Sequence, residues 1–145
     1  MSGSLEGVTP ALPLSVKPVG IVFIDAQHAQ LLAVLERLES LAGTRNEFAA
    51  MVEGVDALFN YAQTHLADEE HLLREIGYPG LEQHAAQHRW FVQMIMQLMT
   101  RLEAGDDILG DLISALRSWF VEHINADDMD YAQHLRPGDA DPDAQ

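Results

Sequence analysis

Residues 84–102 read HAAQHRWFVQMIMQLMTRL, and the apolar positions in this stretch indicate the kind of fold that the chain adopts. These apolar residues recur at intervals of three or four, at Phe91, Ile95, Leu98 and Leu102. Such spacing is typical of the buried face of an α-helix and differs from the alternation of a strand. His84 and His88 continue the same face toward the N-terminal end. The stretch therefore predicts a helix that carries two histidines on its buried face.

Three other segments have the same helical spacing. Their apolar residues are Leu31, Leu32 and Leu35 in the first segment, Phe48, Val52, Val55, Phe59 and Ala62 in the second, and Leu109, Leu112, Leu116 and Trp119 in the last. No segment shows the alternation of a β-strand. Short loops between long helices favour antiparallel neighbours. The sequence therefore predicts an all-α, up-down-up-down four-helix bundle.

Turn and capping residues predict where these helices begin and end. Asp25 can cap a first helix, which ends at Gly43, and the capping-box spacing of Thr44 and Glu47 predicts a second helix, which ends at Gly77. Pro79 suits the first turn of a third helix, which ends at Gly105. Asp106 or Asp107 can cap a fourth helix, which reaches about Leu135 before Pro137. We therefore expect an irregular N-terminal arm over residues 1–20, the bundle over 21–136, and a disordered acidic tail over 137–145.

Composition limits the partners and the compartment. The 145-residue chain has a net charge of −15, which argues against nucleic acid and anionic membranes as partners. It has no cysteine, which excludes disulfides, thiolate metal sites and cysteine nucleophiles. The N-terminus does not resemble a signal peptide, and the apolar run VGIVFI is too short to cross a bilayer. We expect a cytoplasmic protein that does not insert into membranes.

Polar residues lie on the predicted buried faces of all four helices. They are His28 in the first, His65 and Glu69 in the second, His84 and His88 in the third, and His123 in the fourth. A single buried histidine is more often bonded to a backbone carbonyl, and a lone His-x-x-x-His pair is common on solvated faces. Five imidazoles and a carboxylate left unpaired in one core would be costly. Bound metal would satisfy them together, and imidazole with carboxylate suits iron, manganese or zinc.

The positions of these residues along the helices also agree. In an antiparallel bundle, a residue early in one helix lies level with a residue late in the next. His28 and the pair in 84–88 come early in their helices, whereas His65, Glu69 and His123 come late. All of them should therefore lie toward one end of the bundle.

These motifs resemble those of the hemerythrin family, in its single-domain bacterial form. The matching segments are DAQH at 25–28, HLADE at 65–69, HAAQH at 84–88 and HINADD at 123–128. The resemblance covers residues 19 to about 135. It is specific, because seven residue types at fixed spacings rarely coincide by chance. One departure is the arm, where relatives often have a tryptophan and this chain has Val16, Lys17 and Pro18.

The resemblance implies a centre of two iron ions with an oxo or hydroxo bridge, and O2 as its ligand. The implied ligands of one iron are His84, His88 and His123, those of the other are His28 and His65, and Glu69 and Asp128 bridge the two. The open position falls on the iron with two histidines. By their positions in the sequence, Leu66, Trp119, Phe120 and Ile124 should line the O2 pocket, where an apolar wall would exclude water.

The fourth helix leaves a choice between two neighbouring aspartates. In a regular α-helix, Asp127 lies almost beneath His123, whereas Asp128 is about 140° round the axis. The family pattern favours Asp128. A one-residue π-type widening between His123 and Asp128 would reconcile the two, and such widenings occur often at functional sites. We therefore predict that distortion and Asp128 as the ligand.

The expected function is reversible O2 binding, for carriage, storage or delivery, without enzymatic turnover. Two alternatives remain at this stage: sensing of O2 or redox state through a separate signalling partner, and peroxide or nitric oxide chemistry at the same irons. An oxygen-consuming enzyme is another possible partner, and a structural zinc site is the simplest alternative. We expect the remaining polar residues of this region to be exposed, namely Asp68, Glu70, His71 and His134.

Overall fold

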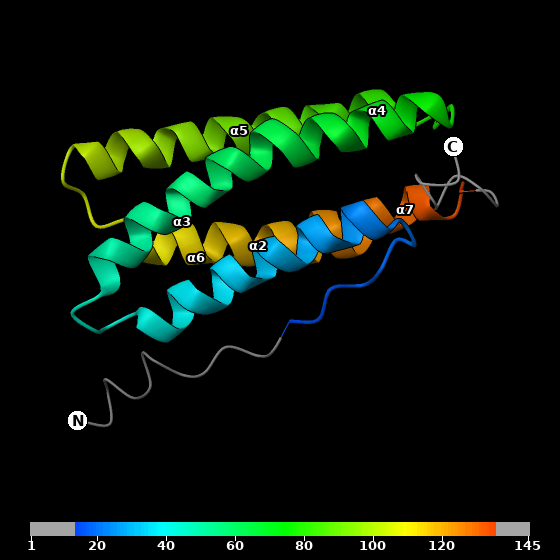
Figure 1. The fold of residues 1–145 in the computed structure, drawn as a ribbon. Helices are drawn as coiled ribbons and strands as arrows, with labels where there is room; N and C mark the ends of the chain where they lie inside the picture. Colours follow the sequence, from blue (N-terminus) through cyan, green and yellow to red (C-terminus); the bar gives the residue numbers. More distant parts are fainter. Residues whose placement is uncertain (1–13, 136–145) are drawn as a thin grey trace.

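The computed structural model describes residues 14–135, which form four long helical rods packed side by side (Figure 1). The first rod is α2 (Val22–Leu41), and the third is α5 (Leu81–Glu103). The second rod consists of α3 (Glu47–Tyr61), the π-helical segment η1 (Ala62–Leu66) and α4 (Ala67–Glu75). The fourth consists of α6 (Leu109–Ser118), the π-helical segment η2 (Trp119–Asp127) and α7 (Asp128–Ala132). No strand occurs in the described part of the chain, and the predicted all-α fold is confirmed.

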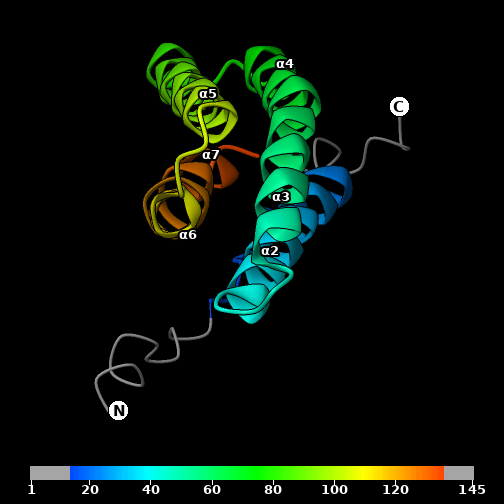
Figure 2. The ribbon, with the colours of Figure 1, turned by 90° about the vertical axis from the view of Figure 1, so that its left-hand side faces the viewer.

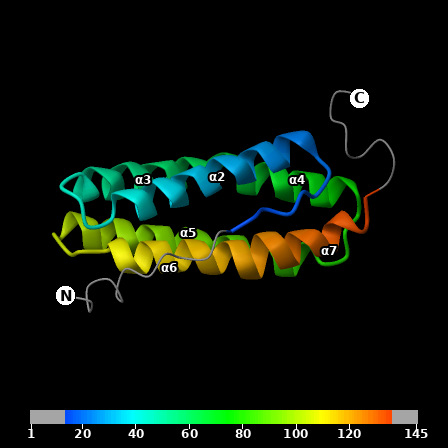
Figure 3. The same cartoon turned by 90° about the horizontal axis from the view of Figure 1, so that it is seen from below.

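The rods run antiparallel, with loops at alternating ends of the bundle. In Figure 2, viewed along the bundle, the four rods surround a common core. Contacts join α2 to α3 and α6, and α5 to α3 and α4. Figure 3 shows residues 14–21, ahead of α2, running alongside the bundle. The up-down-up-down order follows from the short loops, which return each rod beside its predecessor.

The predicted ends of the first three helices are confirmed. Gly43, Gly77 and Gly105 each follow the last helical residue by two positions. At Gly77 the backbone has φ of 70°, a left-handed conformation that glycine adopts without strain. The turn there lets the chain reverse into the third rod.

The predicted beginnings are less accurate. Asp25 does not cap the first helix, which already begins at Val22 because Ile21 and Ile24 are buried in the core. The Asp25 carboxylate instead accepts hydrogen bonds from the backbone N–H of Val19 at 2.8 Å and of Gly20 at 3.2 Å. Its role is to hold the end of the arm against the first turn.

The other caps also differ in detail. Asn46, not Thr44, is the N-cap of α3, although the Glu47 carboxylate reaches back to the N–H of Gly43 at 2.7 Å. Pro79 precedes the third helix and does not lie in its first turn, because Gly80 is the N-cap. Neither Asp106 nor Asp107 is the N-cap of the fourth helix, which is Ile108, although the Asp107 carboxylate accepts a hydrogen bond from the N–H of Leu109 at 3.1 Å.

The predicted buried face of α3 is correct at Val55 and wrong at Phe48, Val52 and Phe59. Phe48, Val52 and Phe59 are 63%, 43% and 36% exposed. The buried face consists of Ala50, Met51, Gly54, Val55, Leu58 and Tyr61. The prediction counted from α3 to His65 at α-helical spacing, but η1 inserts a π-helical turn between them. The extra residue rotates α3, so that Met51, Leu58 and Tyr61 face inward in place of Val52, Phe59 and Ala62.

The arm packs closely although it has no tryptophan. Leu14 and Val16 contact the main core cluster, which is the set of buried apolar residues shared by the four rods, and Val19 is 5% exposed. The Asn125 side chain in η2 accepts a hydrogen bond from the N–H of Lys17 and donates one to the carbonyl of Ser15. Residues 1–13 of the predicted arm and the predicted tail over 137–145 lie outside the described residues. None of the described helices is long and apolar enough to cross a membrane.

Candidate metal centre

The structure brings all seven predicted site residues together inside the bundle. They come from every rod: His28 from α2, His65 and Glu69 from η1 and α4, His84 and His88 from α5, and His123 and Asp128 from η2 and α7. None is more than 3% exposed. Buried imidazoles and carboxylates at this density require partners, which is the condition that a metal site meets.

The π-helical segment η2 determines which aspartate faces inward. It spans Trp119–Asp127, so the predicted π-type widening is confirmed and is longer than one turn. Asp128 is fully buried, whereas the side chain of Asp127 is 34% exposed. A second π-helical segment, η1, contains His65 and was not predicted. Each π-helical segment contains one histidine of the cluster, His65 in η1 and His123 in η2, as is common for such segments at functional sites.

The seven residues form two groups that share their carboxylates. In the group of three histidines, His84 Nε2 and His88 Nε2 each lie 2.9 Å from Glu69 Oε1. Oδ1 of Asp128 lies 2.9 Å from His84 Nε2 and 3.1 Å from His123 Nε2. The cluster therefore has one carboxylate oxygen from each acid facing these three histidines.

The other oxygens face the group of two histidines. Asp128 Oδ2 is 3.1 Å from His28 Nε2, and Glu69 Oε2 is 3.7 Å from His65 Nε2. The Nε2 atoms of His28 and His65 are 3.2 Å apart. Each carboxylate thus divides its two oxygens between the two groups, which is the arrangement that a bridging ligand requires.

Hydrogen bonds on the outer ring nitrogens orient three of the histidines. His65 Nδ1 lies against the side-chain oxygen of Gln27, and His88 Nδ1 is 2.7 Å from Glu70 Oε2. His123 Nδ1 is 2.7 Å from Gln87 Oε1. Since these acceptors favour a proton on Nδ1, the lone pair of Nε2 is directed into the cluster.

Several buried atoms of the cluster have no hydrogen-bond partner in the described part of the chain. They include His123 Nε2 and both carboxylate oxygens of Asp128. Lone pairs directed at one another without a donor cost free energy in a buried site. A cation ligated by these atoms would remove that cost, so the donor set fits metal ions.

The lowered pKa values of the two buried carboxylates also favour bound cations. Burial opposes the charge on Glu69, but the adjacent imidazoles of His123, His84 and His88 hold its pKa well below the usual value. Burial and Glu69 would both raise the pKa of Asp128, yet the adjacent imidazoles of His123, His28 and His84 lower it to about 2. The two carboxylates are therefore anionic at neutral pH and require positive charge nearby.

The histidines respond in opposite directions. Burial lowers the pKa of His65 to about 4. Burial also opposes the charge on His84, but the adjacent carboxylates of Asp128 and Glu69 outweigh it and raise the pKa to about 10. In the protein alone, a proton on His84 supplies part of the positive charge that a metal would otherwise provide.

Sequence reasoning missed the outer residues of the site. Glu70 was expected on an exposed face, but it is half-buried and bonds to His88. The Tyr131 hydroxyl donates to Glu69 Oε2 at 2.7 Å. Gln27 and Gln87 each precede a histidine, but so do Gln83 and Gln133, so the dipeptide alone does not identify them. Each of these outer contacts joins two different rods, so no pattern within a single sequence segment predicts it.

The remaining predictions concern the apolar wall and the surface. The four predicted pocket residues are Leu66, Trp119, Phe120 and Ile124, and all are at most 4% exposed and part of the main core cluster. The Trp119 ring stacks on that of His123, with centroids 3.9 Å apart. His71, His134 and Asp68 are exposed, as predicted.

We expect Glu70→Gln to lower metal affinity by about 10- to 100-fold, a typical effect of removing the outer partner of a histidine ligand. The amide is a weaker acceptor than the carboxylate for the Nδ1 proton of His88. Competition with a chelator of known affinity would measure the change. Glu75→Gln is the matched control, because Glu75 lies on the same helix and contacts only the exposed His71 among ion-pair partners. Equal affinities of the two variants would contradict the role of Glu70.

Comparisons with known proteins point to one family. The model of the hemerythrin HHE cation-binding domain matches residues 19–135. The chain is 35% identical over 118 residues to a bacteriohemerythrin of Stenotrophomonas maltophilia, covering 81% of this chain and 76% of that protein. It is 32% identical over 117 residues to one of Pseudomonas aeruginosa, with the same coverage. A crystal structure of wild-type hemerythrin superimposes with a TM-score of 0.73 and 26% identity, covering 88% of this chain and 98% of the other.

Proposed function

Because the chain belongs to the hemerythrin family, we propose that its buried cluster holds two iron ions and binds O2 reversibly. The observation that carries this proposal is the division of the carboxylate oxygens. Glu69 and Asp128 each direct one oxygen to the group of three histidines and the other to the group of two. One shared acid could belong to a single-ion site, but two acids shared in this way suit a pair of ions.

In this proposal, His84, His88 and His123 would hold one iron, His28 and His65 would hold the other, and Glu69 and Asp128 would be shared between the two, together with an oxo or hydroxo group. When bound, the iron pair would supply the electrons that reversible O2 binding requires. The group of two histidines provides one protein donor fewer than the group of three. The side of His28 and His65 would therefore leave room for O2.

The residues around the cluster support binding without turnover. Phe120 and Ile124 are fully buried, and Leu66 is 4% exposed. Such an apolar wall keeps water from the cluster. The buried hydroxyls of Tyr61 and Tyr131 have raised pKa values, because burial and the Glu69 carboxylate disfavour their ionised forms. Neither tyrosine gives up a proton easily, which disfavours either hydroxyl as a general acid.

This function serves O2 carriage, storage or delivery in a cytoplasmic setting, and the test combines metal analysis with optical spectra. We expect two iron ions per chain and, when the reduced protein meets O2, a visible band that disappears on deoxygenation. Protein treated with a chelator is the control and should give no band. An iron-loaded protein that stays colourless in O2, or that consumes peroxide catalytically, would overturn the proposal.

A further inference from the structure

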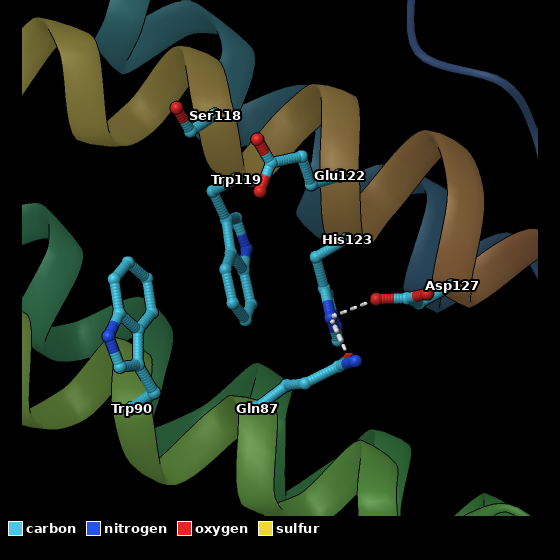
Figure 4. A pocket seen from close by; sticks show the side chains of 7 residues that line it. All are labelled: Gln87, Trp90, Ser118, Trp119, Glu122, His123 and Asp127. Atoms are coloured by element: carbon cyan, nitrogen blue, oxygen red, sulfur yellow. Dashed lines mark hydrogen bonds and ion pairs between the residues drawn. The ribbon is translucent and has the colours of Figure 1, made fainter.

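A pocket lies on the outside of the bundle, between α5 and η2. Its volume is about 200 Å³, smaller than the roughly 300–1,000 Å³ of pockets for drug-sized ligands. Figure 4 shows Trp90 and Gln87 of α5 on one side and Trp119, Glu122 and Asp127 on the other. The chain has two tryptophans, and both line this pocket.

The two indoles have different surroundings. Trp119 is 4% exposed and stacks on His123 and on Phe91, with centroid distances of 3.9 Å and 4.2 Å. It forms a rigid wall. Trp90 is 54% exposed, although tryptophan is a residue that usually buries most of its surface. Its ring stands at the opening and is available to a ligand.

The charged groups of the pocket are acidic. Glu122 is exposed at its edge, and the Asp127 side chain is 34% exposed. No lysine or arginine is among the residues that line it. The chain as a whole carries a net charge of −15, so its field attracts cations and repels anions. An aromatic face beside carboxylates is the combination that binds organic cations.

We propose that this pocket binds a small organic cation of the alkylammonium class. The ammonium group rests on the Trp90 ring, the carboxylates of Glu122 and Asp127 supply negative charge from the opposite wall of the pocket, and the Trp119 ring contacts its methyl groups. The site is separate from the interior of the metal cluster, but it adjoins it. Gln87 and Asp127 both line the pocket and lie 2.7 Å and 3.7 Å from His123 Nδ1. A bound cation therefore touches the groups that orient His123.

The test is calorimetric titration of the metal-loaded full-length protein with choline and with 3,3-dimethylbutan-1-ol, its uncharged carbon isostere. We expect saturable binding of choline, and binding of the alcohol at least about tenfold weaker, because the alcohol lacks the charge that the ring and the carboxylates recognise. Trp90→Leu should weaken choline binding at least about fivefold, and Glu122→Gln about threefold.

Glu103→Gln is the matched control for charge, because Glu103 is exposed on α5 and does not line the pocket. It should leave choline affinity unchanged. Thermal melts would show that the variants fold, and if Trp90→Leu does not, Glu122→Gln decides. Equal affinity for choline and its isostere, or an affinity that neither pocket substitution alters, would overturn the proposal.

Discussion

Asp128→Asn should lower iron affinity by more than about 100-fold and abolish the O2-dependent visible band. Changes to the outer partners of metal ligands already cost about 10- to 100-fold, and a shared ligand should cost more. Asp128 is fully buried, and its two oxygens face His84 and His123 on one side and His28 on the other. Asparagine keeps the shape but replaces one of these oxygens with a donor nitrogen. Iron content and optical spectra would measure the loss.

Asp127→Asn is the control, because it makes the same chemical change at the adjacent residue. Its carboxylate is partly exposed and lies 3.7 Å from the outer nitrogen of His123. We expect it to reduce iron affinity by less than about tenfold, at the low end for an outer partner. If Asp127→Asn were the variant that lost iron, Asp127 and not Asp128 would be the metal ligand, which would contradict the assignment that follows from η2.

The fold and the inner residues of the cluster could be predicted from sequence, for physical reasons. The apolar residues in 84–102 recur over several helical turns, so the pattern identifies a helix even where a single position departs from it. His28, His84 and His88 lie on regular α-helices, where simple counting is accurate. The level of each residue along the bundle follows from antiparallel packing.

Counting failed where the helix is not regular. Both rods that contain π-helical segments, η1 and η2, shift by a residue relative to α-helical spacing. On α3 the shift placed Phe59 on the surface and Leu58 in the core. In the fourth rod the shift was anticipated, because periodicity favoured Asp127 and the family pattern favoured Asp128. In the second rod, periodicity and the family pattern both favoured His65 and Glu69, so nothing indicated the shift, and the predictions for Phe48, Val52 and Phe59 were wrong.

The outer contacts could not be predicted because they depend on the packing of rods distant in sequence. Gln27 bonds to His65 and Gln87 bonds to His123, across 38 and 36 residues. Glu70 bonds to His88 although it neighbours Glu69 on the sequence. A helical count puts Glu70 about 100° from the inner face, toward the surface. Its side chain nevertheless reaches the neighbouring α5, where a partner is available.

Without metal, the free energy of unfolding should be greatest near pH 6.5. His65 has a folded pKa of about 4, below its usual 6.5, so the stability gained from keeping it neutral is lost as pH falls from 6.5 toward 4. His84 has a folded pKa of about 10, so the stability gained from its proton is full below 6.5 and is lost as pH rises toward 10. Each pKa unit corresponds to about 1.4 kcal/mol.

Bound iron should change this dependence above pH 6.5, because ligation requires an unprotonated His84. The metal must displace that proton at neutral pH, and the displacement becomes easier as pH rises toward the His84 pKa of about 10. The gain in melting temperature on iron loading should therefore be larger at pH 8.5 than at pH 6.5. Thermal melts of loaded and chelator-treated protein would measure it. His71→Ala, at an exposed histidine, should leave the difference unchanged. A metal-free protein equally stable at both pH values would show that His84 carries no proton there.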